Sequence, residues 1–388
     1  MFILFYNKVI KKEDILTKIS FKLQSVTPLF MIGANNYSCE FRSSSIKGCI
    51  RYWFRAIYPN LLSEEKRLFG STDFRSPLII RSRSIKPVFG SKGDKSWNKS
   101  SISYLGFGAI DFKGTTQSFF KVGSVFDLEL VFKGSLDATD QSYILNSVWG
   151  LFMLGGVGSR SRRGFGCMRV LDVQDEYGLL KNIPPFKFNN RNEYVDAVKK
   201  FIQLQTISNK QHNHTAFSSD MQLIITRDNH PSMVVLEKIG KNFQYFRSYI
   251  RDRQYPEDHD IMLNFLQKGI PPKKSPDRAA FGLPHNYFFP SRPSMIGGVD
   301  ILDGDQKGRK GQKGRRGSPL FIHIQGFEKG TSCGVFIFMP APLIPENDKI
   351  VISGSKSYRR DVKVDPPDYS GVEKYLKHLI QKGEEKIL

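Results

Sequence analysis

Residues 154–166 read LGGVGSRSRRGFG, a stretch that combines five glycines with three arginines. Glycine allows positive φ angles and close backbone approach, and the arginine fork matches phosphate oxygens, so this composition suits a polyphosphate. The stretch is not a P-loop, because no Gly-Lys-Ser/Thr follows. It also trails an apolar helix, whereas a dinucleotide-binding fingerprint opens one. A flexible basic turn is the alternative interpretation.

The charge of the whole chain favours a polyanionic partner. The 388 residues include 58 Lys and Arg against 37 Asp and Glu, which gives a formal net charge of +21. Nucleic acid and an acidic membrane surface are the leading candidates for a chain this basic. The length allows two or three domains, and the 40% hydrophobic content is sufficient for packed cores.

Targeting and redox signals are few. No apolar run approaches 18 residues, and the opening MFILFY leads into a charged cluster with no small-residue cleavage site. We therefore expect a cytoplasmic protein. The cysteines are Cys39, Cys49, Cys167 and Cys333. Their scattered spacing indicates neither a disulfide framework nor a cysteine-based zinc site.

The first half of the chain predicts a ferredoxin-like domain. Hydrophobic periodicity predicts strands over 19–26, 78–85, 126–132 and 167–173, and helices over 46–57 and 141–154. The order is β-α-β-β-α-β, the split βαβ arrangement that RNA recognition motifs also use, with two helices covering one face of an antiparallel sheet. The glycine-rich stretch directly follows the second helix.

The second half repeats the first in degenerate form. Residues 316–322, RGSPLFI, resemble residues 75–80, RSPLII. A strand over 221–226, a helix over 233–250, a strand over 333–338 and a helix over 369–381 follow the same order, but no fourth strand is evident before the chain stops. The sequence therefore predicts an α+β protein with two tandem ferredoxin-like domains, the second degenerate.

Two further basic features accompany the glycine-rich stretch. Lys47, Arg51 and Arg55 are spaced by four on the first helix, and no Asp or Glu lies between Phe41 and Ser63. This row predicts an external anion, although such rows are more often solvated helix faces. Within a long insertion at about 253–318, a glycine-containing tract carries Lys307, Arg309, Lys310, Lys313, Arg315 and Arg316. We expect this tract to be mobile unless a polyanion orders it.

These motifs together resemble the RAMP superfamily of CRISPR-associated proteins, and within it the family of the first-numbered Cmr subunit of type III-B effector complexes. The resemblance rests on the glycine-rich stretch after the second helix, the FRSSSIKGCIRYWFR helix at 41–55 and the repeated Arg-Ser-Pro-Leu theme. It implies two tandem RAMP domains, expected at 1–180 and 217–388, joined by a linker and helix at 181–216.

The resemblance implies a non-catalytic RNA-binding subunit without a cofactor or metal. Its expected partners are guide RNA, target RNA and other Cmr or RAMP subunits, with no membrane. We expect sequence preference to be weak, because phosphate contacts position a strand without reading its bases. The expected RNA-binding residues are Lys47, Arg51, Arg55, Gly156, Gly158, Arg160, Arg162, Arg163, Gly164, Phe165, Arg309, Lys310, Lys313, Arg315 and Arg316.

The main alternative is a metal-independent endoribonuclease that processes CRISPR RNA. Cleavage of this type favours a histidine for proton transfer, yet the first 211 residues contain none. His212 and His214 could act as acid and base or as two metal ligands, but no third ligand lies nearby in sequence. His285 could contact a partner. A membrane-surface protein is the least favoured class, because the basic helix at 46–57 needs its apolar side, including Trp53, for its own core.

Overall fold

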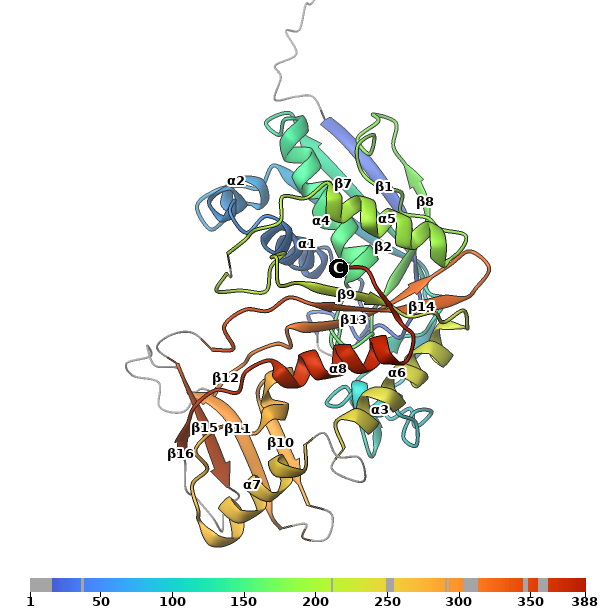
Figure 1. The fold of residues 1–388 in the computed structure, drawn as a ribbon. Helices are drawn as coiled ribbons and strands as arrows, with labels where there is room; N and C mark the ends of the chain where they lie inside the picture. The colour runs from blue at the N-terminus through green and yellow to red at the C-terminus, as the bar shows by residue number, and fades with distance from the viewer. Residues whose placement is uncertain are drawn as a thin grey trace, which may run out of the picture.

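The computed structural model describes residues 16–35, 38–210, 212–248, 255–289, 292, 294–302, 313–344, 348–354 and 362–388. Figure 1 shows the described chain as three tiers, each built around one β-sheet. The first half forms the upper tier, the second half forms the middle tier, and a lobe around α7 forms the lower one.

The first tier has the predicted ferredoxin-like topology. Its elements are β1 (Leu16–Ser25), α1 (Ser43–Ile57), β2 (Leu78–Lys86), β7 (Val125–Lys133), α4 (Ala138–Leu154) and β8 (Met168–Gln174). The sheet order is β2-β7-β1-β8 and all pairings are antiparallel. Alternation in β1 buries Ile19, Phe21 and Leu23 in one core with the apolar stripes of α1 and α4.

Short elements fill the segment between β2 and β7. They are β3 (Phe89–Gly90), α3 (Ile102–Leu105), β4 (Ile110–Asp111), β5 (Gly114–Thr115) and β6 (Phe119–Phe120). Ile102, Leu105 and Ile110 are buried in a core that they share with the second half. The segment therefore belongs to the junction between the halves, although its Gly, Ser and Lys content is typical of a surface loop.

The second tier repeats this topology. After α5 (Arg191–Gln203), it comprises β9 (Gln222–Ile225), α6 (Ser232–Phe246), β13 (Leu320–Gly326), β14 (Ser332–Phe338), α8 (Ser370–Gln381) and β17 (Glu385–Lys386). The order β13-β14-β9-β17 is equivalent to that of the first sheet. The expectation of a missing fourth strand was wrong, because β17 pairs with β9. The two-residue strand is too short to produce an alternating pattern in the sequence.

The insertion folds into a third sheet with its own core. The lobe contains α7 (Pro256–Lys268), η3 (Asp277–Phe281), β10 (His285–Phe288), β11 (Ile296–Leu302), β12 (Lys313–Gly314), β15 (Lys349–Gly354) and β16 (Val362–Val364). Met262, Val299 and Ile350 are among its buried residues. The lobe thus draws on two insertions, because β15 and β16 come from a segment after β14 that the sequence did not reveal.

The repeated Arg-Ser-Pro-Leu theme marks equivalent positions in the two halves. Leu78 begins β2 and Leu320 begins β13, each the second strand of its sheet and each at a sheet edge. The two Phe-Gly pairs that precede them also correspond. Gly70 after α2 (Glu65–Phe69) has φ 82° and Gly282 after η3 has φ 124°, a region that favours glycine.

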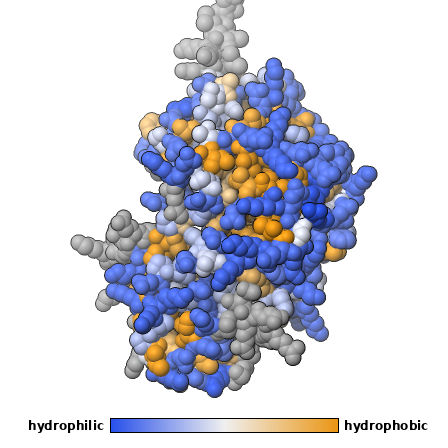
Figure 2. Space-filling view, in the orientation of Figure 1, coloured by the Kyte–Doolittle hydropathy of each residue, from blue (hydrophilic) through white to orange (hydrophobic). Residues whose placement is uncertain are grey.

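Exposed apolar side chains remain on the folded surface. Figure 2 shows that the viewed face is mostly hydrophilic, with apolar residues gathered in the middle of its upper part. No helix in the described part of the chain is long and apolar enough to cross a membrane.

A Trp53→Ala substitution should lower the free energy of unfolding by about 3 to 5 kcal/mol. Trp53 is 2% exposed, its ring lies 6.0 Å from that of Phe321 in the second half, and a Cβ added at Gly155 would lie 2.5 Å from its indole nitrogen. Urea unfolding followed by circular dichroism measures the change. Phe112→Ala is the control, since Phe112 is 84% exposed. A loss below about 1 kcal/mol for Trp53→Ala would place this side chain outside the core.

Candidate nucleic-acid interface

The glycine-rich stretch docks onto the edge strand of the second sheet. Arg163 forms a parallel β-bridge with Ile322 of β13, and the Ile322 N–H donates to the Arg162 carbonyl at 3.1 Å. Further along β13, the His323 ring donates from Nδ1 to the carbonyl of Gly155 at 2.5 Å. The stretch is therefore an ordered connection between the two halves, which excludes the alternative of a flexible basic turn.

The glycines of the stretch allow close packing, two of them within the first half and one against the second. A Cβ added at Gly158 would lie 2.5 Å from the carbonyl oxygen of Phe30, and one at Gly156 would lie 2.7 Å from that of Phe165. A Cβ at Gly164 would meet Leu236 of α6 at 2.7 Å. These close approaches explain Gly156, Gly158 and Gly164 by packing within the protein, where the sequence predicted amides that approach phosphates.

The structure contradicts the prediction that Phe165 contacts a base. Phe165 is fully buried, and its ring centroid lies 5.7 Å from that of Phe30. Its neighbours Gly164 and Gly166 have φ angles of 83° and 64°, which turn the chain so that the side chain points under the stretch. Packing is the role that the structure assigns to Phe165.

Two of the three arginines of the stretch also bind the second half. Arg162 donates to the carbonyl of Ser318 at 2.7 Å and stacks its guanidinium over Phe321 at 4.5 Å. Arg163 donates to the carbonyl of Phe281 at 2.7 Å. Arg160 differs from both: it is exposed, its φ is 63°, and its side chain makes no hydrogen bond or ion pair with any described residue.

The basic row on α1 has hydrogen-bonding partners inside the protein, which its spacing did not predict. Arg51 and Arg55 each contact Glu65 Oε1 at 2.7 Å, and Lys47 donates to Ser76 Oγ at 2.6 Å. The spacing along α1 could not reveal this pairing, because Glu65 belongs to α2, which folds back against α1. The cleft described next is lined by other residues and includes none of Lys47, Arg51 and Arg55.

The basic tract reaches the interface at its C-terminal end. Arg315 is exposed beside Arg160, and the Arg316 guanidinium donates to the carbonyl of Pro342 at 2.7 Å. Lys313 begins β12, where only its backbone is described. Arg309 and Lys310 lie outside the described residues.

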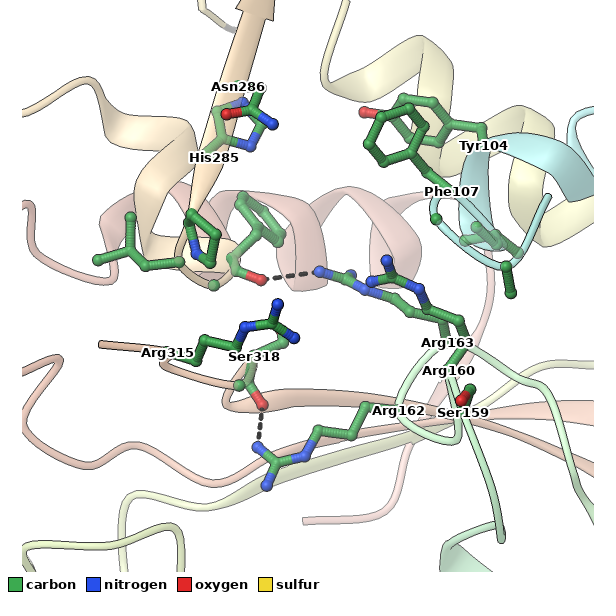
Figure 3. A pocket seen from close by; sticks show the side chains of 18 of the residues that line it. Tyr104, Phe107, Ser159, Arg160, Arg162, Arg163, His285, Asn286, Arg315 and Ser318 are labelled. Carbon is green, nitrogen blue, oxygen red and sulfur yellow. Dashed lines mark hydrogen bonds between the residues drawn. The ribbon is translucent and has the colours of Figure 1, made fainter. Parts of the chain in front are cut away.

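The stretch, α3, the β10 region and residues 315–318 enclose a cleft of about 890 Å³ (Figure 3). Its described lining contains no carboxylate. The arginines that line it are Arg160, Arg162, Arg163, Arg247, Arg315 and Arg316. Figure 3 shows Arg160 and Arg163 extending from the stretch toward the β10 side, with Tyr104 and Phe107 above them and Arg315 opposite. We call this feature the arginine cleft.

Positive charges in the arginine cleft act on one another. Burial lowers the pKa of Arg163 to about 9, and the nearby charges of Arg247 and Arg160 contribute in the same direction. Partial desolvation of its guanidinium group by the cleft lowers the pKa of Arg160, and the nearby charge of Arg315 lowers it further. The cleft therefore holds repelling cations that a bound anion would relieve.

The histidines do not form a metal site among the residues with described positions. The rings of His212 and His214 lie 5.8 Å apart, and His214 Nε2 donates to the carbonyl of Arg55 at 3.1 Å. No group of three His, Cys, Asp or Glu side chains that could hold a metal occurs in the described residues. His285, by contrast, lines the arginine cleft.

Sequence reasoning missed several residues that line the cleft. Arg247 follows the last turn of α6, and it stacks on Phe243 and Phe281 at 4.9 and 4.8 Å. Phe107 lies in the segment rich in Gly, Ser and Lys and is 56% exposed. No local motif distinguishes these residues, because their proximity arises only when the two halves dock.

Comparisons with known proteins agree with this architecture. A model of the RAMP superfamily matches residues 22–169. The Cmr subunit Cmr1-2 of Pyrococcus furiosus is 33% identical over 181 residues, which cover 39% of this chain and 93% of that protein. Cmr1-1 of the same organism is 30% identical over 202 residues, which cover 47% of this chain and 56% of that protein.

Solved structures share the fold over almost the whole length. The crystal structure of Cmr1 from Pyrococcus furiosus in its apo form has a TM-score of 0.58 at 19% identity and covers 95% of this chain and 98% of its own. A chain of the type III-B Cmr-beta complex bound to cognate target RNA and AMPPnP in the presence of single-stranded DNA has a TM-score of 0.51 at 14% identity, with coverage of 94% and 99%. The chain is similar in sequence to Cmr1-2 over almost all of that protein, and it shares the fold of the Cmr1 crystal structure. It therefore belongs to the Cmr1 family of Cmr subunits within the RAMP superfamily.

Proposed function

We propose that this chain is a non-catalytic RNA-binding subunit of a type III-B CRISPR effector complex, and that it holds guide or target RNA in the arginine cleft. The observation that carries the proposal is the cleft itself: six arginines from both halves converge there, and no carboxylate occurs in its described lining. A nucleic-acid backbone supplies the negative charges that such a surface lacks.

The exposed residues of the cleft suit a single strand. Arg160 and Arg315 lie at its surface without an acidic partner among the described residues, so they are available to phosphate oxygens. Phe107 presents an exposed ring on the Arg160 side of the cleft, and base stacking on aromatic rings tolerates any sequence. In this proposal Lys313, Arg309 and Lys310 extend the contact along the basic tract.

The relatives support the assembly part of the proposal. The Pyrococcus furiosus proteins are named as Cmr subunits, and chains of similar fold occur in Cmr-beta complexes bound to cognate target RNA. Exposed rings such as Phe74 and Phe89 are available for contacts with neighbouring subunits. We place the complex in the cytoplasm.

The double substitution Arg160→Ala with Arg315→Ala should weaken binding of a single-stranded RNA at least about tenfold, because two charge-assisted contacts are lost. The slope of log K against log salt should also become shallower by about 1.4, since each single-strand phosphate contact contributes about 0.7. Fluorescence anisotropy between 50 and 300 mM salt measures both quantities.

Arg81→Ala is the matched control, because Arg81 on β2 pairs with Glu129 on β7 and does not line the cleft. Arg162 and Arg163 are left intact in this test, since their contacts with Ser318 and Phe281 join the two halves. Unchanged affinity and slope in the double variant would defeat the cleft as the RNA site.

One observation favours the endoribonuclease alternative, namely the position of His285 in the cleft. Burial holds the pKa of His285 well below its usual value, with Arg247, Arg278 and Arg163 adding to the effect, which keeps the ring neutral but also makes it a weak proton acceptor. A catalytic site would also need a proton donor for the leaving oxygen.

Incubation of the protein with a CRISPR-repeat RNA in EDTA should give binding without cleavage, because no partner acid accompanies His285 in the described lining of the cleft. Denaturing gels and mass spectrometry of the RNA ends provide the measurement. Specific cuts that disappear in a His285→Ala variant would instead establish the processing enzyme.

A further inference from the structure

The floor of the arginine cleft contains a second, more buried group of side chains. Arg163 and Arg247 both stack on the ring of Phe243, with guanidinium carbons 5.0 and 4.9 Å from its centroid. Phe281 contributes a further ring 4.8 Å from Arg247, and His285 lies on the adjoining wall. We call Arg163, Arg247, Phe243, Phe281 and His285 the floor cluster.

The two guanidinium groups of the floor cluster have unused donors. Arg247 is 7% exposed, and its Nε donates to no acceptor among the described residues. Arg163 donates from Nη2 to the Phe281 carbonyl, but its buried Nη1 has no acceptor in that part of the chain. Buried donors without acceptors are costly, and here the cost falls on charged groups.

Asp258, an acidic side chain on α7 of the neighbouring lobe, is committed to other donors. Asp258 accepts from Arg278 Nε and Tyr287 Oη at 3.2 Å each, and also from the backbone N–H groups of Asp277 and Arg278. It lies outside the cleft lining. The floor cluster therefore has aromatic support but no acidic partner among the described residues, which leaves its donors available to an external anion.

We propose that the floor cluster binds a nucleotide phosphomonoester, either the terminal phosphate of an RNA strand or that of a free nucleoside monophosphate. This inference rests on the proposed function, in that it assigns the end of an RNA to the base of the same cleft. The internal phosphates of the strand remain with Arg160 and Arg315 at the surface.

Charge and shape both favour a monoester over an internal phosphodiester. A phosphomonoester carries about −1.5 to −2 charges near pH 7 and offers three terminal oxygens, whereas a diester carries one charge. Buried Phe243 and Phe281 close the floor beneath the two guanidinium groups. A chain end needs only one exit from such a floor, while an internal phosphate needs room for the strand on both sides.

The walls above the floor have the chemistry of a nucleoside site. A cleft of about 890 Å³ lies within the range of small-molecule pockets. Figure 3 shows Tyr104 and Phe107 on one wall and His285 and Asn286 on the other, with the arginines below and between them. The aromatic wall can stack a base, and the amide and imidazole can reach its polar edge.

The test compares three RNA decamers of identical sequence, which carry a 5′-phosphate, a 3′-phosphate or hydroxyl groups at both ends. We expect one phosphorylated decamer to bind at least about tenfold more tightly than the hydroxyl decamer, as measured by fluorescence anisotropy with an internal label. The advantage should disappear in Arg247→Gln and persist in Arg247→Lys, which keeps the charge. Arg81→Gln serves as the control outside the cleft.

Competition separates the two sources of the phosphate. AMP should displace the phosphorylated decamer from the floor and adenosine should not. A decamer that binds at least about tenfold more tightly than AMP identifies an RNA end, because the strand adds the surface contacts. Equal affinities for AMP and the phosphorylated decamer identify a free nucleotide.

The monoester also predicts a dependence on pH. Its second pKa is about 6, so lowering the pH from 7.5 to 5.5 removes about one negative charge and should reduce the advantage of the phosphorylated decamer. The groups that face the floor are Arg160, Arg163, Tyr104, Arg247, Arg278, His285, Arg315 and, from α8, Tyr375. Burial and the surrounding arginines hold the pKa of His285 well below its usual value.

Failure of this inference is distinct from failure of the proposed function. Equal binding of all three decamers without competition by AMP overturns the phosphomonoester site and leaves RNA binding in place. Absence of binding by every decamer overturns the proposed function. The wild-type comparison decides between these outcomes even if Arg247→Gln does not fold.

Discussion

The docking of residues 155–166 onto the edge of the second sheet is the contact on which the rest of the molecule depends. The bridge between Arg163 and Ile322, and the hydrogen bond from His323 to the Gly155 carbonyl, fix the second half against the first. Gly164 permits the close approach, because a Cβ there would meet Leu236 of α6, while Gly158 and Gly166 let the stretch fold tightly against first-half carbonyl groups. The same docking brings arginines of one half close to arginines of the other, so the contact between the halves also forms the arginine cleft.

Much of the fold was predictable because its signals are local and repeated. The alternation of Ile19, Phe21 and Leu23, together with the apolar stripe of α1, specified the first sheet and its helices without any tertiary information. The Arg-Ser-Pro-Leu theme located the same strand in the second half. The elements that the sequence did not predict are short or discontinuous. The strand β17 has two residues, and the third sheet combines segments from two separate insertions.

The site was predicted less well, because its partners are distant in sequence. The sequence indicated a phosphate-binding stretch with three arginines, yet Arg162 and Arg163 use carbonyl groups of the second half as acceptors. Glu65 pairs with both Arg51 and Arg55, and it lies on an element that helical spacing does not reveal. Arg247 stood outside every motif. Among the described arginines of the stretch and the basic tract, Arg160 and Arg315 are the exposed ones in the cleft, and both lie in sequence rich in glycine and arginine whose geometry the docking sets.

The walls of the arginine cleft come from different halves of the chain, and this has a thermodynamic consequence. A strand that contacts both walls binds only while the halves are docked, so its binding free energy adds to the stability of the joint through linkage. Because buried cores already run across the joint, the two ferredoxin-like units share their packing even in the empty chain. An occupied cleft should therefore raise the temperature at which both halves unfold.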